Sequence, residues 1–404
     1  MPDGTYVLAD LPRGINSHFG NELKRYILYQ NYVNNVSQVK IKQELNEIGI
    51  EISEGQINNI ILNASEMLKK EYMDIGRVGI TTAYELYVDD TGNRHNGENG
   101  NTLAVLNKFF SFFVSSNSKS RIQFLKTLLC GNTDYMLKNI SFDFLKRYKL
   151  TEEIKYKLLQ LKDINFANKL DWNNALIKSG ITPMVAGKQL LIHIEEAGML
   201  GSLINHGVSP NLVIVSDGAS SFNVFNHGNC WMHAERAIKK LTPIDEIDIV
   251  EIEKVQDDIW NFYNQLKNYK KNPNDIDKVI ISKKFDEIFT QTVTSMKLTA
   301  ALKKFRMKKD DLLRVLDYPF IDTHNNSSEL DIRSMVIKNN ISGQTRSEDG
   351  RNARDSLLSI TKTCKKLGIS IREFLIDRLN GTNKIPYLPD LIRQRAESFL
   401  MAPP

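Results

Sequence analysis

The chain has 404 residues, of which 41% are hydrophobic and 25% are charged, and its formal net charge of +5 is compatible with a polyanionic partner without requiring one. Its three widely spaced cysteines exclude a disulfide framework, and no apolar run reaches the roughly 18 residues of a membrane span. Residues 1–10 also lack the charged and apolar regions of a signal peptide. We therefore expect a cytosolic protein of two or three domains with no membrane partner.

Residues 1–80 have the pattern of a helical DNA-binding region. Between residues 38 and 48, apolar residues recur at helical spacing near one face, at Val39, Ile41, Leu45 and Ile48. The Ser53–Gln56 segment has the form of a capping box and starts a second helix. Two helices joined by a short turn outline a helix-turn-helix, in which three polar side chains of the second helix suit contacts to adenine edges: Gln56, Asn58 and Asn59. An amphipathic helical hairpin without this role remains open.

Residues 81–130 indicate the first part of a sheet. A strand over residues 83–90 ends at Asp89 and Asp90, residues 91–100 are predicted to form a turn-rich loop, and two further strands complete an antiparallel meander. Period-two alternation points the two aspartates to opposite faces, so only one of them can enter a shared site. Residues 131–205 are predicted to be mostly helical, and their sequence suggests no role.

Residues 206–241 contain a buried strand that ends in an aspartate. The apolar run at residues 212–215 is followed by Asp217 and Gly218. A cap or an Asx-turn explains such an aspartate, and a functional carboxylate explains it equally well. Residues 242–318 form a helical block with a basic cluster, in which Lys303 and Lys304 suit contacts to DNA phosphates. A solvated helix face explains the cluster nearly as well.

Residues 319–404 are predicted to contain a helix that carries Glu329, followed by a polar loop and closing helices. Arg333 lies one helical turn beyond Glu329, so both side chains project from one face. Arg333 can clamp a DNA phosphate or form an ordinary i,i+4 surface pair. We expect Leu330 and Ile337 to anchor the other side of this helix to the core.

Three carboxylates thus occur in the order strand, strand and helix: Asp89 or Asp90, then Asp217, then Glu329. Magnesium prefers carboxylate oxygens and keeps several waters, so a two-metal site needs few protein ligands if they converge. Two such ions about 3.5–4 Å apart activate a nucleophile and stabilise the leaving oxygen of a phosphodiester. Spacing alone does not establish convergence, and each carboxylate also has an ordinary structural explanation.

Four short blocks follow one another along the chain: V-D-D-T-G at Val88–Gly92, V-S-D-G at Val215–Gly218, C-W-M-H-A-E-R at Cys230–Arg236 and H-N-N-S-S-E-L-D-I-R at His324–Arg333. They are similar to the D-E-T, D-G, C-W-x-H-x-x-R and D-N-N-x-x-E-R-x-x-R blocks of bacterial insertion-sequence transposases of the DDE type, in the insertion-sequence sixty-six group. Residues 356–375 also look like the closing helices of that family. The resemblance therefore spans most of the chain.

The resemblance implies an α/β fold: a ribonuclease-H-like, mixed-sheet catalytic core with a helical insertion and a helical N-terminal DNA-binding part. It implies that Asp89, Asp217 and Glu329 are the catalytic, metal-binding triad, with Asp90 at the place of the family's glutamate. The implied cofactor is Mg²⁺, for which Mn²⁺ can substitute. The implied partners are DNA, as element ends and as target, a homo-oligomer assembled on DNA, and accessory proteins in a bacterial cytoplasm.

The H-x-x-C-x-x-H spacing of His227, Cys230 and His233 suggests zinc, but no obvious fourth ligand lies nearby in the sequence. The corresponding block of the family recurs without an assigned metal. We therefore expect Cys230, Trp231 and His233 to support the active site structurally.

The predicted function is metal-dependent DNA cleavage and strand transfer in the transposition of an insertion sequence. Two alternatives remain open, namely a catalytically inactive DNA-binding derivative of such an element and a ribonuclease-H-like nuclease without strand transfer. Two departures from the family pattern keep these two alternatives open. I-S-G-Q-T-R-S-E-D-G at residues 341–350 stands where the family has an Arg-Lys-Asn-Trp block, and the interval between Asp89 and Asp217 is long.

Overall fold

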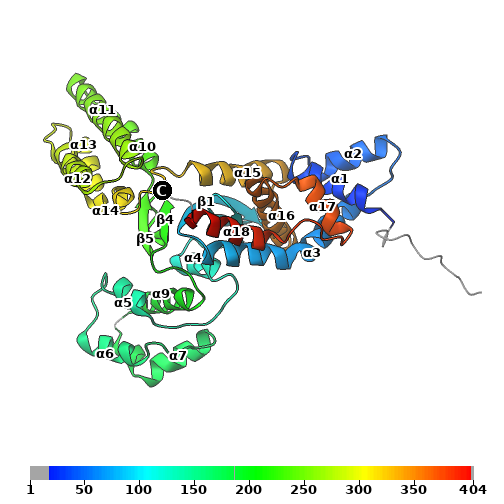
Figure 1. The fold of residues 1–404 in the computed structure, drawn as a ribbon, viewed down its shortest axis with the longest axis horizontal. Helices are drawn as coiled ribbons and strands as arrows, with labels where there is room; N and C mark the ends of the chain where they lie inside the picture. Colours follow the sequence, from blue (N-terminus) through cyan, green and yellow to red (C-terminus); the bar gives the residue numbers. More distant parts are fainter. Residues whose placement is uncertain (1–17, 186, 402–404) are drawn as a thin grey trace, which may run out of the picture.

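The computed structural model describes residues 18–185 and 187–401 of the chain. The molecule is elongated, with a small mixed sheet near its centre and helices around it (Figure 1). The N-terminal helices α1 and α2 lie at one end, and the helices of residues 242–318 project at the other (Figure 1). The expectation about a signal peptide concerned residues 1–10, which lie outside the described ranges.

The sheet has five strands in the order β3-β2-β1-β4-β5. Its strands are β1 (Glu85–His95), β2 (Glu98–Leu106), β3 (Ser111–Ser116), β4 (Val213–Ser216) and β5 (Asn226–Asn229). The first three strands pair antiparallel, whereas β4 runs parallel to both β1 and β5. The protein is therefore a mixed α/β fold, and β4 brings a distant part of the sequence beside β1.

The loop expected at residues 91–100 is wrong, because these residues continue the β1–β2 ladder. The register pairs Asp90 with Leu103 and runs to His95 opposite Glu98. Asn96 and Gly97, both with positive φ, form the two-residue turn between the strands. An Asn-Gly pair favours a tight hairpin turn that matches the twist of the flanking strands. Polar side chains are tolerated here because this end of the hairpin is largely exposed.

The sheet separates two hydrophobic clusters, and successive β1 residues alternate between them. Leu86 and Val88 belong to a cluster with the N-terminal helices and α16, whereas Tyr87 belongs to a cluster with the helices of residues 242–318 and α15. Successive side chains of a strand point to opposite faces of a sheet. The alternation therefore assigns each side chain near the end of β1 to one of two different environments.

The N-terminal region contains three helices, α1 (Asn21–Tyr32), α2 (Gln38–Glu47) and α3 (Glu54–Thr81). The Ser53 hydroxyl accepts a hydrogen bond from Gln56 N–H and starts α3 at the expected residue. The predicted apolar face of α2 is correct only in part, since Val39 and Ile48 are exposed. At 28 residues, α3 is much longer than a hairpin needs, because its C-terminal half packs against β3 and α16.

Helices account for most of the remaining chain. After β3 come α4 (Arg121–Leu128), α5 (Asn139–Leu145), α6 (Glu152–Gln160), α7 (Lys169–Lys178), α8 (Ile181–Met184) and α9 (Lys188–Asn205). After β5 come α10 (Trp231–Lys239), α11 (Glu246–Tyr269), α12 (Asp275–Thr290), α13 (Met296–Met307) and α14 (Lys309–Leu312). The C-terminal part contains α15 (Asn326–Ser342), α16 (Glu348–Leu367), α17 (Ile371–Leu379) and α18 (Leu388–Met401). Within the described ranges, none of these helices combines the length and apolarity that a bilayer crossing requires.

Trp231, the first residue of α10, lies at the centre of the helices that follow β5. Its side chain is 2% exposed, and its indole N–H donates to the Leu312 carbonyl at 2.8 Å. Four aromatic rings from α11, α12 and α13 lie within 6.4 Å of its ring: Phe262, Phe285, Phe289 and Phe305. This aromatic core joins the helical insertion to the helix that directly follows the sheet.

Replacing Trp231 with alanine should therefore destabilise the protein strongly. Loss of a fully buried tryptophan side chain costs about 3–5 kcal/mol because it leaves a cavity. Trp260 on α11 provides a matched control, since its side chain is 37% exposed. In urea titrations, Trp231→Ala should shift the midpoint far more than Trp260→Ala, and equal shifts would contradict the central position of Trp231.

Candidate active site

The parallel pairing of β1 and β4 brings Asp89, in the middle of β1, beside Asp217, the residue that follows β4. The parallel register of β1 and β4 pairs Tyr87 with Val215, so continuing it by two residues sets Asp89 opposite Asp217. One Asp217 carboxylate oxygen accepts a hydrogen bond from Ala219 N–H at 3.0 Å, which is the Asx-turn weighed from the sequence. Asp217 nevertheless remains exposed at the edge of the sheet. The turn and a functional role are therefore compatible.

The same strand separates Asp89 from Asp90. Asp89 lies two residues after Tyr87 in the strand, so both side chains lie on the sheet face that α15 covers. Asp90 lies on the other face. The Asp90 carboxylate forms an ion pair with Lys119 there. Alternation from the sequence left open which aspartate faces the other carboxylates. The structure places Asp89 on that face.

Helix α15 brings Glu329 to the sheet, close enough to Asp89 for the two carboxylates to interact. The carboxylate is 24% exposed, and its helix packs along β1 and β2. The expected anchors Leu330 and Ile337 are wrong, because they are 59% and 38% exposed. Ile332 and Met335 face the core instead, since that side of the helix meets the sheet.

Further along the helix, Asp331 accepts a hydrogen bond from Ser111 Oγ at 2.6 Å. The buried Lys338 donates to the Asn31 carbonyl on α1, and burial lowers the pKa of Lys338 to about 7. Helix α15 is therefore held to both the sheet and the N-terminal helices.

Asn325 joins three segments immediately before α15. This residue is fully buried, and its side-chain amide donates to the Val88 carbonyl at 3.0 Å. Its backbone N–H donates to Cys230 Sγ at 3.2 Å, and Trp231 N–H donates to the Thr323 carbonyl at 3.0 Å. The residue before Asp89, the start of α10 and the start of α15 are thereby linked.

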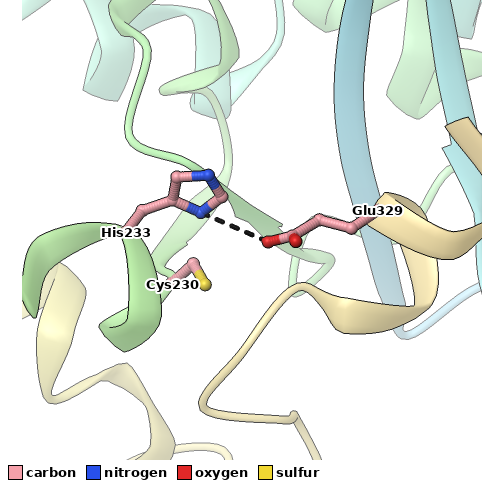
Figure 2. Close-up of side chains that lie close together, drawn as sticks. All are labelled: Cys230, His233 and Glu329. Atoms are coloured by element: carbon pink, nitrogen blue, oxygen red, sulfur yellow. Dashed lines mark ion pairs between the residues drawn. The ribbon is translucent and has the colours of Figure 1, made fainter. Parts of the chain in front are cut away.

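His233 and Arg236, one turn apart on α10, flank the Glu329 carboxylate. His233 Nδ1 lies 3.6 Å from Glu329 Oε1, and Arg236 Nη2 lies 3.5 Å from Glu329 Oε2. Figure 2 shows the imidazole and the carboxylate facing each other, with the Cys230 thiol beside them. Arg236 Nη1 also lies 3.1 Å from His233 Nε2. The two α10 side chains therefore form a connected pair against Glu329.

One donor atom from each of Cys230, His233 and Glu329 lies within 4.8 Å of the other two. A guanidinium can only donate, so His233 Nε2 accepts from Arg236 and the imidazole proton is assigned to Nδ1, toward Glu329. A ring nitrogen that carries a proton cannot bind a metal. Burial also raises the pKa of the Cys230 thiol, which disfavours the metal-binding thiolate. His227, the remaining residue of the spacing, instead bonds Ser216 and Asp311. These contacts favour orientation of Glu329 over zinc binding.

Burial and the neighbouring carboxylates both affect the pKa of Asp89. Burial raises the pKa of its carboxyl to about 6, partly opposed by a hydrogen bond from Asp90 N–H. The charges of Asp217, Asp90 and Glu329 contribute to this same raised value, so the three candidate carboxylates interact electrostatically. Glu329 Oε1 is buried and has no hydrogen-bond partner within the described ranges. Carboxylate oxygens in this state fit a hard divalent cation, which neutralises them and fills the missing coordination.

The other residues predicted for DNA contact lie apart from this cluster. Lys303 and Lys304 are exposed on α13, and Lys304 is the nearer because it lines a cavity with Asp217. Arg333 is exposed and forms no ion pair with Glu329 in the described part of the chain. The three polar residues of α3 lie at its N-terminal end, toward the opposite end of the molecule: Gln56, Asn58 and Asn59 (Figure 1).

Sequence reasoning missed two residues near the carboxylates, Arg236 and Asn325. Arg236 stands in the same block as His233, and the i,i+3 spacing of a helix was the signal that pairs them. Asn325 stands in the His324–Arg333 block, where no role was assigned to it, and its side chain does not cap α15. Its long-range contact with β1 has no local sequence signal.

Comparison with known proteins agrees with three of the four sequence blocks, those at Val215–Gly218, Cys230–Arg236 and His324–Arg333. The profile described as "Transposase IS66 family" matches residues 204–353. An uncharacterised protein of Sinorhizobium fredii, y4jO, is 38% identical over 301 residues, which cover 74% of this chain and 93% of that protein. The chain belongs to the IS66 transposase family. The resemblance stated from the sequence is thus confirmed.

The IS66 match includes Asp217, the Cys230–Arg236 block and Glu329, whereas Asp89 lies before it. The matched range therefore contains most of the residues that surround Glu329. Because transposases act on DNA, the family also indicates DNA as the substrate.

The raised pKa of Asp89 predicts how stability depends on pH in the absence of divalent cations. A carboxyl whose folded pKa is raised contributes stability that is present below its unfolded pKa of about 3.8 and lost as pH rises through about 6. Asp89→Asn removes this titration, so the variant should be more stable at pH 8 by on the order of 1–2 kcal/mol after allowance for solvent screening. Urea titrations in EDTA should show this difference, and it should disappear near pH 4.

Proposed function

We propose that this IS66 transposase cleaves DNA strands at the ends of its element and joins them to target DNA, using Asp89, Asp217 and Glu329. The observation that carries the proposal is the placement of these carboxylates, which come from the middle of β1, from the residue after the adjacent parallel strand β4, and from α15. They interact electrostatically despite separations of more than 100 residues in the sequence. Such concentration of like charge is typical of sites that bind metals or catalyse reactions.

The three carboxylates would hold Mg²⁺, or Mn²⁺ in its place. The bound ions would lower the pKa of a water or hydroxyl nucleophile and stabilise the leaving oxygen of the phosphodiester. The partnerless Glu329 Oε1 and the raised pKa of Asp89 support this ligand set. A binding readout that does not depend on activity follows: Mg²⁺ should raise the melting temperature of the wild-type protein at pH 8 and have little effect on Asp89→Asn.

The protein's own groups orient the site. Arg236 contacts both His233 and Glu329, so its planar guanidinium fixes the orientation of the Glu329 carboxylate, which would face the substrate phosphate. His233 presents Nδ1 toward Glu329 Oε1 at 3.6 Å, whereas Arg236 lies near the other oxygen of the carboxylate group. Asn325 and the buried Cys230 hold the segments that carry these groups. Pre-organisation of this kind places the charges before the substrate arrives.

DNA would contact both ends of the molecule. We assign sequence reading to Gln56, Asn58 and Asn59, in a helix-turn-helix-like arrangement of α2 and α3. Lys303 and Lys304 on α13 would contact phosphates near the carboxylates. The adjacency of the parallel strands β1 and β4, with Asp89 and Asp217 two residues beyond their last paired residues, supports a ribonuclease-H-like core. Assembly of a homo-oligomer on DNA and accessory proteins belong to the same proposal.

Single substitutions of the triad test the catalytic assignment. Asp89→Ala, Asp217→Ala and Glu329→Ala should each abolish Mg²⁺-dependent nicking of a duplex that carries the inverted repeat flanking the gene, because each removes a ligand. Binding of the duplex, measured by anisotropy, should be largely retained. Asp90→Ala is the matched control, since Asp90 faces Lys119 and should leave nicking intact. An active Asp217→Ala protein would refute the triad.

Nicking without joined products would instead favour a nuclease without strand transfer. Binding without nicking in the wild-type protein would favour a catalytically inactive derivative. The same gel separates these outcomes because nicked and joined strands differ in length.

Conservative changes at two arginines separate their roles. Arg236→Lys should lower nicking at least about tenfold, because a lysine cannot contact His233 and Glu329 together. Arg333→Lys should also lose activity if Arg333 clamps a phosphate bidentately. Melting temperatures should barely change because both side chains are solvent-accessible. Full activity in Arg333→Lys would make Arg333 a surface residue and leave Arg236 as the arginine that acts at Glu329.

A further inference from the structure

A cavity opens directly beside the candidate carboxylates, between β4, α10 and α13. It has a volume of about 300 Å³, at the lower end of the range of about 300–1,000 Å³ for small-ligand pockets. Asp217 and His233 stand at its border with the site. Its walls are mostly apolar: Ala234, Ala237, Ala301, Phe305, Met307 and Leu312. The alanines of two different helices leave space that larger side chains would fill.

Polar groups lie at defined places around this apolar space. Lys304 and Lys308 line it, and the Lys308 amine lies 3.4 Å from the Gly218 carbonyl. Asn229 also lines the cavity and is only 6% exposed, yet no group of residues 18–185 or 187–401 donates to its Oδ1. A buried amide without a partner is costly unless a ligand satisfies it. Asn229 therefore indicates a ligand that carries a hydrogen-bond donor.

Gly218 keeps the amide and the amine close to the Asp217 turn. Its φ is +90°, and a Cβ at this position would lie 2.5 Å from Asn229 Oδ1 and 2.6 Å from Lys308 Nζ. Any other residue would displace both groups from the space around the turn. The cavity and the Asp217 carboxylate are therefore parts of one arrangement.

We propose that this cavity binds one unstacked nucleobase of the DNA strand whose phosphodiester lies at the carboxylates. The inference rests on the proposed cleavage function, and it adds where a neighbouring nucleotide goes. A base has two apolar faces for the alanine, Phe305 and Met307 walls and a polar edge for Asn229. The lysines are suited to the phosphates that flank it.

Other occupants fit less well. A phosphate in the cavity would lose water to apolar walls, which is unfavourable for a charged group. The cavity borders Asp217, so a base of the strand that meets the carboxylates is close enough to enter it. Enzymes that act on DNA accept the cost of unstacking a base when a pocket receives it.

The test uses the full chain in EDTA, so that no strand is cut. The probe is a duplex of the element's end and flanking DNA, with 2-aminopurine at one position at a time around the terminal phosphodiester. Unstacking raises 2-aminopurine fluorescence, so binding of the wild-type protein should raise the signal about fivefold at one position. Ala237→Trp and Ala234→Phe fill the cavity from α10, and both should abolish the increase.

Ala300→Trp is the matched control, because Ala300 is an exposed alanine on α13 that does not line the cavity. It should keep the full fluorescence increase. Anisotropy of a labelled duplex should show binding by all variants, and melting temperatures should show that they fold. Two filling variants on different positions guard against misfolding of either one.

A fluorescence increase that survives both filling variants, or no increase at any position in a bound duplex, would overturn the inference. Absence of DNA binding by the wild-type protein would overturn the proposed function together with it. If the increase depends on the cavity but Mg²⁺ produces no nicking, base binding stands and the cleavage proposal alone fails.

Discussion

The candidate site depends on the buried junction at Asn325. A single side chain donates to the Val88 carbonyl while its own backbone N–H donates to Cys230. These bonds connect Val88 of β1, the start of α10 and the start of α15 in a fully buried place, where an unmet hydrogen bond costs about 1–3 kcal/mol. Together with the packing of α15 on β1 and β2, this connection sets the position of Glu329 relative to Asp89.

The junction brings together charges that would otherwise avoid one another. The charges of Asp217 and Glu329 raise the pKa of Asp89, and only His233 and Arg236 stand close to Glu329 as counter-groups among the described residues. A protein selected only for stability would not gather carboxylates in this way, because like charges destabilise the folded state. The arrangement is understandable if a cationic partner completes it.

The helical insertion contributes more than a spacer. Trp231 anchors it to α10, and α13 supplies one wall of the cavity beside Asp217. The aromatic core therefore controls the position of Lys304 relative to the strand ends. A rigid support of this kind positions a binding surface more precisely than a loop does. The insertion projects at one end of the molecule and meets the central sheet at the candidate site (Figure 1).

The sequence by itself determined the family, the buried strand before Asp217 and the order of the carboxylates, because short blocks and apolar runs are local signals. It did not determine the strand pairing on either side of Asn96–Gly97, where the polar residues 91–100 were expected to form a turn-rich loop. The tertiary structure alone decided that Asp89 rather than Asp90 faces Glu329, that Arg236 contacts it, and that Ile332 rather than Leu330 faces the core. Those choices depend on which face of a strand or helix another segment covers, and that segment lies far away in the sequence.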